Sequence, residues 1–262
     1  MRHETPLTQD QSNEGPEEGR VGPEEGRTRK KRTSGGPVVK LFILGLPGSG
    51  KSEIARYLIN YVSSERVDKQ SDQLCSASRF NDYAILDDMF RQDTKGRFKP
   101  TAPGGFDVLD LSVFDEALQI LEQEVNSYIS SGVIENDGKE LIVIEFSRND
   151  YSRAFEQFNQ SFLRDAYFLY LDTELETCKQ RVRNKILNPK YEDDYPVSEY
   201  IFENYYSKDN WLQTMDDLTK DLGIDRRHVS TFNNNLPEEV VLGKYAKFEN
   251  REPIRGKDWI MF

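Results

Sequence analysis

The chain has 262 residues and a formal net charge of −11, with 36% hydrophobic and 31% charged residues. This length accommodates one large domain or two small ones, and the acidic balance disfavours a duplex-binding surface, which leaves a basic footprint. The longest apolar run, Leu41–Leu46, is too short to cross a bilayer, so we expect no membrane partner.

The segment Met1–Pro37 has almost no large apolar side chains and contains Gly-Pro-Glu-Glu-Gly-Arg twice, at 15–20 and 22–27. It cannot bury enough apolar surface to offset the entropy of ordering, so we expect a disordered N-terminal arm. Its acidic and basic residues balance, which places the net charge in the expected domain, 38–262. The basic run Arg29–Arg32 fits a phosphate contact, an address signal or a solvated linker, and we favour the linker.

The two cysteines, Cys75 and Cys178, lie far apart and have no second Cys or His at metal-ligand spacing. Free thiols are typical of a reducing compartment, and the N-terminus lacks an apolar signal core. These features predict a cytoplasmic protein.

The stretch Val38–Ser52 is typical of a strand, a glycine-rich turn and the start of a helix. Its second half, GLPGSGKS, fits the pattern G-x-x-x-x-G-K-[ST]. Glycines let the backbone wrap so that N–H groups point at phosphate oxygens; Lys51 can reach the β- and γ-phosphates, and the Ser52 hydroxyl can ligate Mg²⁺. The alternative is a plain glycine-rich turn, but the apolar run before it and the helical pattern after it favour phosphate binding.

This stretch resembles the phosphate loop of the P-loop NTPase superfamily. The resemblance implies ATP and Mg²⁺ as cofactors. It also implies nucleotide contacts from Gly45, Pro47, Gly48, Ser49, Gly50, Lys51 and Ser52, with Lys51 acting in catalysis.

Apolar runs and helical periodicity alternate along the rest of the domain. After the first strand and helix we expect strands at Tyr83–Leu86, Leu141–Phe146, Ala166–Leu171 and His228–Phe232, and helical segments at Leu109–Ile129, Tyr151–Leu163, Glu174–Leu187 and Val197–Leu222. The pattern predicts an α/β fold with a five-stranded parallel sheet and helices on both faces. Ligands should bind outside the carboxyl ends of its strands.

Asp88 and Arg91 form an Asp-x-x-Arg pair just past the expected second strand. With a phosphate loop, this arrangement resembles the P-loop kinases, including polynucleotide 5′-kinases and zeta-toxin-like kinases. The resemblance implies that Asp88 lies by the acceptor hydroxyl as base or orienting group and that Arg91 binds the acceptor or a phosphate. Asp87 is a close second choice for the acid, and the alternative is a helix N-terminus in which Asp87 or Asp88 is a cap.

Glu145 ends the clearest central strand, where the superfamily carries a second acidic residue that holds Mg²⁺ directly or through water. Glu-Phe-Ser-Arg at 145–148 also resembles the Glu-Arg-Ser run of deoxynucleoside kinases. Arg148 is displaced by two positions from that pattern, and we expect it to bind the substrate.

The segment at about 181–197 resembles the lid of small nucleotide kinases. The lid arginines of that family fold over the transferring phosphate, and Arg181 is the first choice among Arg181, Arg183 and Lys185. The resemblance also implies that Asn234, after the last strand, meets the adenine, although asparagines are ordinary turn formers as well.

Together these features predict a P-loop kinase that transfers the γ-phosphoryl group of ATP to a hydroxyl or phosphate acceptor. A small molecule or nucleotide is the favoured acceptor, and a nucleic-acid acceptor is disfavoured. The alternative is a nucleotide-dependent switch or assembly factor that hydrolyses ATP slowly. The sequence leaves the acceptor and the oligomeric state open.

Overall fold

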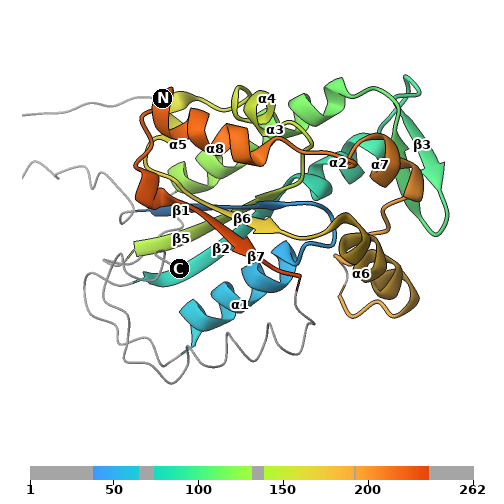
Figure 1. The fold of residues 1–262 in the computed structure, drawn as a ribbon, viewed down its shortest axis with the longest axis horizontal. Coiled ribbons are helices and arrows are strands. Elements are labelled where there is room, and N and C mark those ends of the chain that lie inside the picture. The colour runs from blue at the N-terminus through green and yellow to red at the C-terminus, as the bar shows by residue number, and fades with distance from the viewer. Residues whose placement is uncertain (1–37, 65–73, 132–138, 192, 236–262) are drawn as a thin grey trace, which may run out of the picture. The chain divides into compact units, whose positions relative to one another are not determined.

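A computed structural model of the chain describes residues 38–64, 74–131, 139–191 and 193–235 (Figure 1). The expected arm, Met1–Pro37, and the last part of the expected domain, 236–262, lie outside the described residues. All statements below concern the described part of the chain.

Five strands form one parallel sheet in the order β2-β5-β1-β6-β7. They are β1 (Val38–Gly45), β2 (Leu74–Asn81), β5 (Lys139–Phe146), β6 (Tyr167–Asp172) and β7 (Val229–Asn233). The predicted five-stranded parallel sheet is therefore confirmed, with β1 at its centre. A separate antiparallel hairpin, β3 (Phe98–Thr101) and β4 (Gly105–Val108), lies between the expected strand at Tyr83–Leu86 and the expected helix at Leu109–Ile129, where we expected neither a strand nor a helix.

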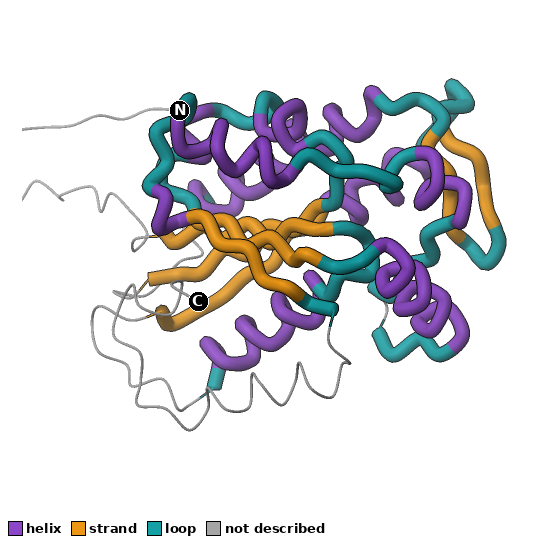
Figure 2. Tube along the Cα trace, viewed as in Figure 1, coloured by secondary structure: helices purple, strands orange, loops and turns teal. Residues whose placement is uncertain are grey.

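Helices cover both faces of the sheet (Figures 1 and 2). Phe42 and Leu44 of β1 belong to one apolar cluster, while Leu41 and Ile43 belong to another with residues of α1. Successive side chains of a strand point to opposite faces, so a strand buried on both sides needs this continuous apolar run. The helices are α1 (Lys51–Ser63), α2 (Asp82–Arg91), α3 (Ser112–Ser130), α4 (Tyr151–Phe155), α5 (Gln160–Leu163), α6 (Leu175–Leu187), α7 (Glu199–Asn204) and α8 (Trp211–Lys220), with a short 3₁₀ turn at Arg226–His228.

The expected second strand, Tyr83–Leu86, is wrong. The strand is β2, and residues 82–91 form helix α2, whose first turn is capped by the Asn81 side chain accepting from the Ala84 N–H at 3.0 Å. β2 lies at the edge of the sheet, and half of its residues are polar, because an edge strand needs no continuous apolar run. The apolar residues Ile85 and Leu86 are instead the buried face of a helix.

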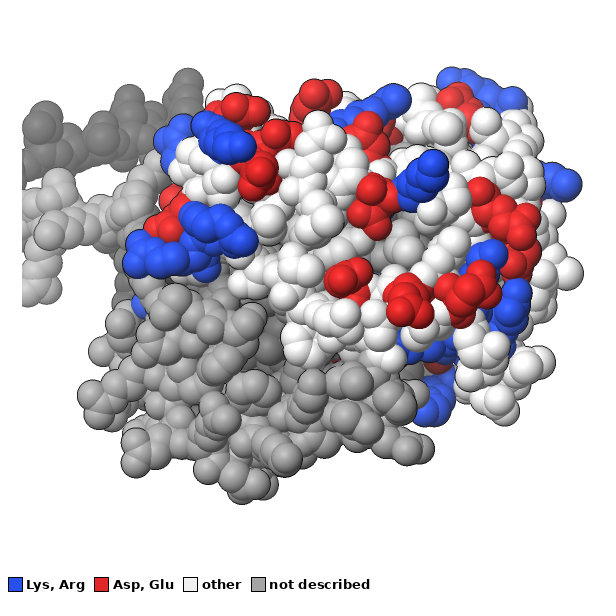
Figure 3. Space-filling model, viewed as in Figure 1, with Lys and Arg blue, Asp and Glu red and all other residues white. Residues whose placement is uncertain are grey.

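Two expected helices are interrupted. The stretch 151–163 contains α4 and α5, and the stretch 197–222 contains α7 and α8. In the ranges that the structure describes, no helix is both long and apolar enough to cross a bilayer. On the face in view in Figure 3, acidic and basic side chains of the described residues are interspersed, without a continuous basic stripe.

Candidate functional site

The phosphate loop connects the carboxyl end of β1 to the first residue of α1. Gly45, Gly48 and Gly50 all have positive φ angles, of 136°, 80° and 102°. The N-cap of α1 is Gly50, and no side chain caps the free N–H groups of the first turn. A helix N-terminus with open donors after a wrapped glycine loop is an anion-binding arrangement.

A Cβ would meet close neighbours at all three of these glycines, and the contacts at Gly48 and Gly50 show what the loop packs against. A Cβ on Gly48 would overlap the backbone carbonyl of Cys178 in α6, and a Cβ on Gly50 would lie 2.6 Å from the Asn234 side-chain nitrogen. Any larger residue at either position would have to push neighbouring atoms away in addition to straining the backbone. The loop is therefore held against α6 and the end of β7.

Lys51 lies inside the curve of the loop. Its Nζ donates to the carbonyl oxygens of Gly45 at 3.0 Å and Leu46 at 2.9 Å, and to the Ser147 Oγ at 2.7 Å. Burial lowers the pKa of Lys51 to about 8, an effect partly opposed by the negative charge of Glu145. The ammonium group is placed to exchange these neutral acceptors for phosphate oxygens.

The predicted metal pair, Ser52 and Glu145, comes together where the first turn of α1 meets the carboxyl end of β5. The Ser52 Oγ donates to the Glu145 Oε2 at 3.3 Å, although the two residues are 93 positions apart. Glu145 is buried and also accepts from Arg79, a residue of β2 that the sequence analysis did not select. Oxygen donors of this kind suit Mg²⁺, with phosphate oxygens and water completing the coordination. Within the described ranges, no three His, Cys, Asp or Glu side chains gather as a metal-binding group.

Asn234 supports the phosphate loop from behind. Its side-chain nitrogen donates to the Ser49 carbonyl at 2.6 Å, and its backbone N–H donates to the Asp172 carbonyl at 2.8 Å. Arg181 in turn donates to the Asn234 carbonyl at 2.9 Å. Asn234 is 3% exposed, so its amide is committed to the loop and is not presented to an adenine edge. We now interpret Asn234 and Arg181 as residues that position the loop.

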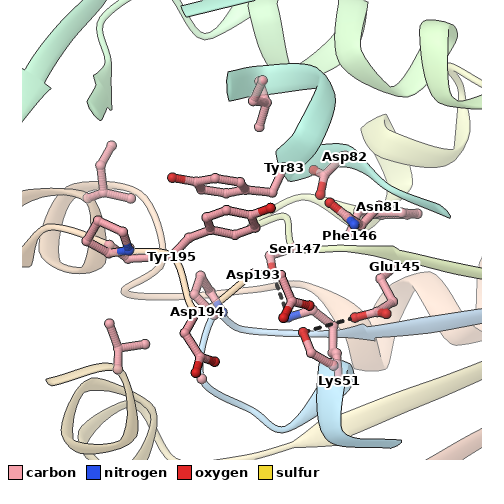
Figure 4. Close-up of a pocket in the computed structure, with 18 of the residues that line it drawn as sticks. Lys51, Asn81, Asp82, Tyr83, Glu145, Phe146, Ser147, Asp193, Asp194 and Tyr195 are labelled. Atoms are coloured by element: carbon pink, nitrogen blue, oxygen red, sulfur yellow. Dashed lines mark hydrogen bonds between the residues drawn. The ribbon is translucent and has the colours of Figure 1, made fainter. Parts of the chain in front are cut away.

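A cavity extends from the phosphate loop to a wall made by α2, β4 and the segment after α6 (Figure 4). Pro47, Gly48, Lys51 and Ser52 line one side of it. The opposite side is aromatic: Tyr83 and Tyr195 stack with ring centroids 3.7 Å apart, and Tyr83 also stacks on Phe106 at 5.4 Å. One cavity thus joins a phosphate-binding side to an apolar side.

Asp82, the first residue of α2, is an acid that directly follows β2. It lines the cavity, and its carboxylate is paired with the buried guanidinium of Arg148. Arg148 also donates to the carbonyl oxygens of Ser147 at 2.7 Å and Phe114 at 2.8 Å. Arg148 does not line the cavity, so it holds Asp82 and the end of β5 in place and makes no direct contact with a ligand there.

Asp88 and Arg91 lie elsewhere. Both are in the second half of α2 and are exposed, and neither lines the cavity. Arg91 pairs with Asp87 one helical turn away, at 2.7 Å. The strand placement on which the assignment of Asp88 and Arg91 depended is wrong. Asp82, which follows the real strand, occupies the position that we assigned to Asp88.

The segment expected to be a lid consists of the end of α6 and the loop that follows it. Asp193 in this loop accepts from Arg56 at 2.7 Å and pairs with Arg79, and Lys185 contacts Asp194 at 3.3 Å. Asp193, Asp194 and Tyr195 line the cavity (Figure 4). Of the three cations that the sequence analysis considered for the lid, Lys185 lines the cavity, whereas Arg181 and Arg183 do not.

No family model matches the chain, and no curated protein matches it in sequence. Among solved structures it is similar to a shikimate kinase from Acinetobacter baumannii in complex with shikimate, with 13% identity, a TM-score of 0.39, and coverage of 82% of this chain and 96% of that chain. It is similar to Kti12 from Chaetomium thermophilum in complex with ADP-AlF3, with 16% identity, a TM-score of 0.43, and coverage of 80% and 97%. It is also similar to a gluconokinase from Sinorhizobium meliloti 1021, with 11% identity, a TM-score of 0.40, and coverage of 84% and 100%.

The described part of the chain has the predicted α/β fold: a five-stranded parallel sheet with a phosphate loop after its central strand. Because all three TM-scores lie below 0.5, we base the functional conclusions on the geometry of the site itself.

Proposed function

We propose that this protein transfers the γ-phosphoryl group of ATP to a hydroxyl or phosphate group of an acceptor. The observation that carries the proposal is the single cavity that has the phosphate loop on one side and an apolar, aromatic wall on the other. Phosphoryl transfer requires a second molecule beside the γ-phosphate, and this wall provides the space and the surface for it. A protein that only hydrolyses ATP has no need of such a wall.

The residues of the kinase-like domain divide into three groups of roles. The loop N–H groups and Lys51 would bind the phosphates, and Ser52 and Glu145 would hold Mg²⁺ directly or through water. The ion, when bound, neutralises charge on the β- and γ-phosphate oxygens. Asp82 would orient the attacking group of the acceptor or accept its proton.

Arg79 is a further candidate for charge stabilisation in this proposal. It lines the cavity and pairs there with Glu145 and Asp193. In this proposal Arg79 has the charge-stabilising role that the sequence analysis assigned to Arg181. A guanidinium at this position can move toward the phosphates as negative charge spreads in the transition state.

The proposal is tested with γ-labelled ATP, Mg²⁺ and a mixed panel of alcohols and phosphate esters, with Lys51→Ala as the inactive control. We expect a labelled organic product with the wild type and none with Lys51→Ala. Release of inorganic phosphate alone, unchanged by every compound in the panel, would refute phosphotransfer and support the switch or assembly factor.

A further inference from the structure

The apolar wall of the cavity comes from three separate elements of the chain. Tyr83 belongs to the first turn of α2, Phe106 to β4, and Tyr195 to the loop after α6. The Tyr83 and Tyr195 rings are nearly parallel, with an angle of 13° between their planes, and both rings are partly exposed at the cavity (Figure 4). Phe106 stacks on Tyr83 as well, at 5.4 Å, so the faces of the Tyr83 ring are covered by protein. The face of Tyr195 that is turned away from Tyr83 is the one on which another flat ring can stack.

The charged side chains that line the cavity are paired with one another or with charged neighbours outside its lining. Of the described residues that line it, four are carboxylates and three are cations: Asp82, Glu145, Asp193 and Asp194 against Lys51, Arg79 and Lys185. Lys51 belongs to the phosphate loop and is turned toward it. Asp82 is paired with Arg148, and Asp193 is also paired with Arg56, so the acceptor side has no excess of charge of either sign.

The two remaining cations already have anionic partners. Arg79 pairs with Glu145 and Asp193, and Lys185 contacts Asp194 at 3.3 Å as well as Glu53 at 2.6 Å. An acceptor that carries its own phosphate or carboxylate would have to displace one of these partners and then lie beside the carboxylate that it displaced. Like charges at such distances repel, so the cavity selects against an anionic acceptor.

We infer that the acceptor is a small alcohol that carries a flat, unsaturated ring and no phosphate or carboxylate group. Its ring would stack on the face of Tyr195 that is turned away from Tyr83, and its hydroxyl would face Asp82 and the γ-phosphate. This inference rests on the proposed function and narrows it. It excludes nucleotides, sugar phosphates and nucleic-acid ends, because each of these brings an anionic group into the cavity.

The test uses pairs of compounds that share the same hydroxyl and differ by one anionic group. Thymidine is compared with thymidine 3′-monophosphate, pyridoxine with 4-pyridoxic acid, and glucose serves as an uncharged alcohol without a flat ring. With γ-labelled ATP, we expect at least one uncharged ring compound to have a kcat/KM about 100-fold higher than that of its anionic counterpart. Its kcat/KM should also be about 100-fold higher than that of glucose. Equal or better transfer to an anionic member, or to glucose, would overturn the inference.

A pair of tyrosine variants tests the stacking wall. Tyr195→Ala removes one ring of the wall and should raise KM for the ring compound about tenfold while the Kd for Mg·ADP stays the same. Tyr191→Ala is the matched control, because Tyr191 lies four positions earlier, contacts Arg56 and does not line the cavity. Equal KM values for the two variants would overturn the stacking role.

Failure of phosphotransfer itself gives a different result, in which the label goes to water with every compound. The protein bound to Mg·ADP is then titrated calorimetrically with thymidine, pyridoxine and their anionic counterparts. Preferential binding of an uncharged member supports the ring site independently of transfer. Absence of binding by both uncharged compounds, or tighter binding of the anionic ones, overturns it.

Discussion

The lowered pKa of Lys51 predicts that nucleotide affinity falls steeply above about pH 8. In the nucleotide-free protein, burial lowers this pKa to about 8. The charged fraction of Lys51 then falls from about three quarters at pH 7.5 to about 3% at pH 9.5, which is a factor of about 25. Bound phosphates favour the charged form, so binding above pH 8 requires uptake of a proton, and the Kd for Mg·ADP should rise about 25-fold across this range.

The assay is isothermal titration of Mg·ADP from pH 7.5 to 9.5 in buffers of different ionisation enthalpy. Phosphate groups titrate near pH 6, so the ligand keeps a constant charge over this range. Lys51→Met should bind more weakly at pH 7.5 and show a flat profile. A flat wild-type profile, or the same slope in Lys51→Met, would refute the assignment of the titration to this lysine.

The lowered pKa of Lys51 also determines how the free energy of unfolding changes with pH. Between about pH 8 and the ordinary lysine pKa of 10.5, the unfolded chain holds a proton on Lys51 that the folded protein has released. Lys51 therefore contributes an increase in the free energy of unfolding as the pH rises through this window. Urea unfolding of the wild type and Lys51→Met at pH 7.5 and 9.5 measures the difference.

Three substitutions, and one control substitution at Gly96, test how the phosphate loop and the lid segment are held in place. Gly48→Ala should abolish Mg·ADP binding, because the new methyl group meets a backbone carbonyl of α6; Gly96→Ala also adds a methyl group at positive φ, but in open space, and should leave binding unchanged. Tyr151→Phe removes the hydroxyl that accepts from the Gly45 N–H at 2.9 Å, and should lower the free energy of unfolding by about 1–3 kcal/mol in urea. Asp193→Asn weakens the pairing with two arginines and should accelerate Mg·ADP release about tenfold in stopped flow; an unchanged rate would mean that the segment does not limit release.

The phosphate loop and its metal pair could be predicted from the sequence because their signals are local. Gly45 to Ser52 form a contiguous motif, and Glu145 ends a strand whose unbroken apolar run identifies it as central. Parallel strands then bring their carboxyl ends to one edge, which is why Ser52 and Glu145 meet at 3.3 Å.

The acceptor side could not be predicted in the same way. β2 is an edge strand in which polar and apolar residues are mixed without a continuous apolar run, so the sequence pattern did not identify it. The positions of Arg79 and Asp82 were missed with it. Tyr195 lies in a loop without periodicity, and only the tertiary structure brings it onto Tyr83. Asn81 followed by Asp82 is typical of a helix start, and this signal places the candidate acid at Asp82 and not at Asp88.

The hydrogen bond from the Asn234 side chain to the Ser49 carbonyl determines when, during synthesis, the growing chain first binds nucleotide. The two residues are 185 positions apart, and Ser49 leaves the ribosome long before Asn234. A nascent chain that ends before β7 contains the complete loop motif but lacks the side chain that holds the loop from behind. Translation intermediates shorter than this should therefore fail to capture ATP, and nucleotide binding should begin only when the last strand of the sheet has been added.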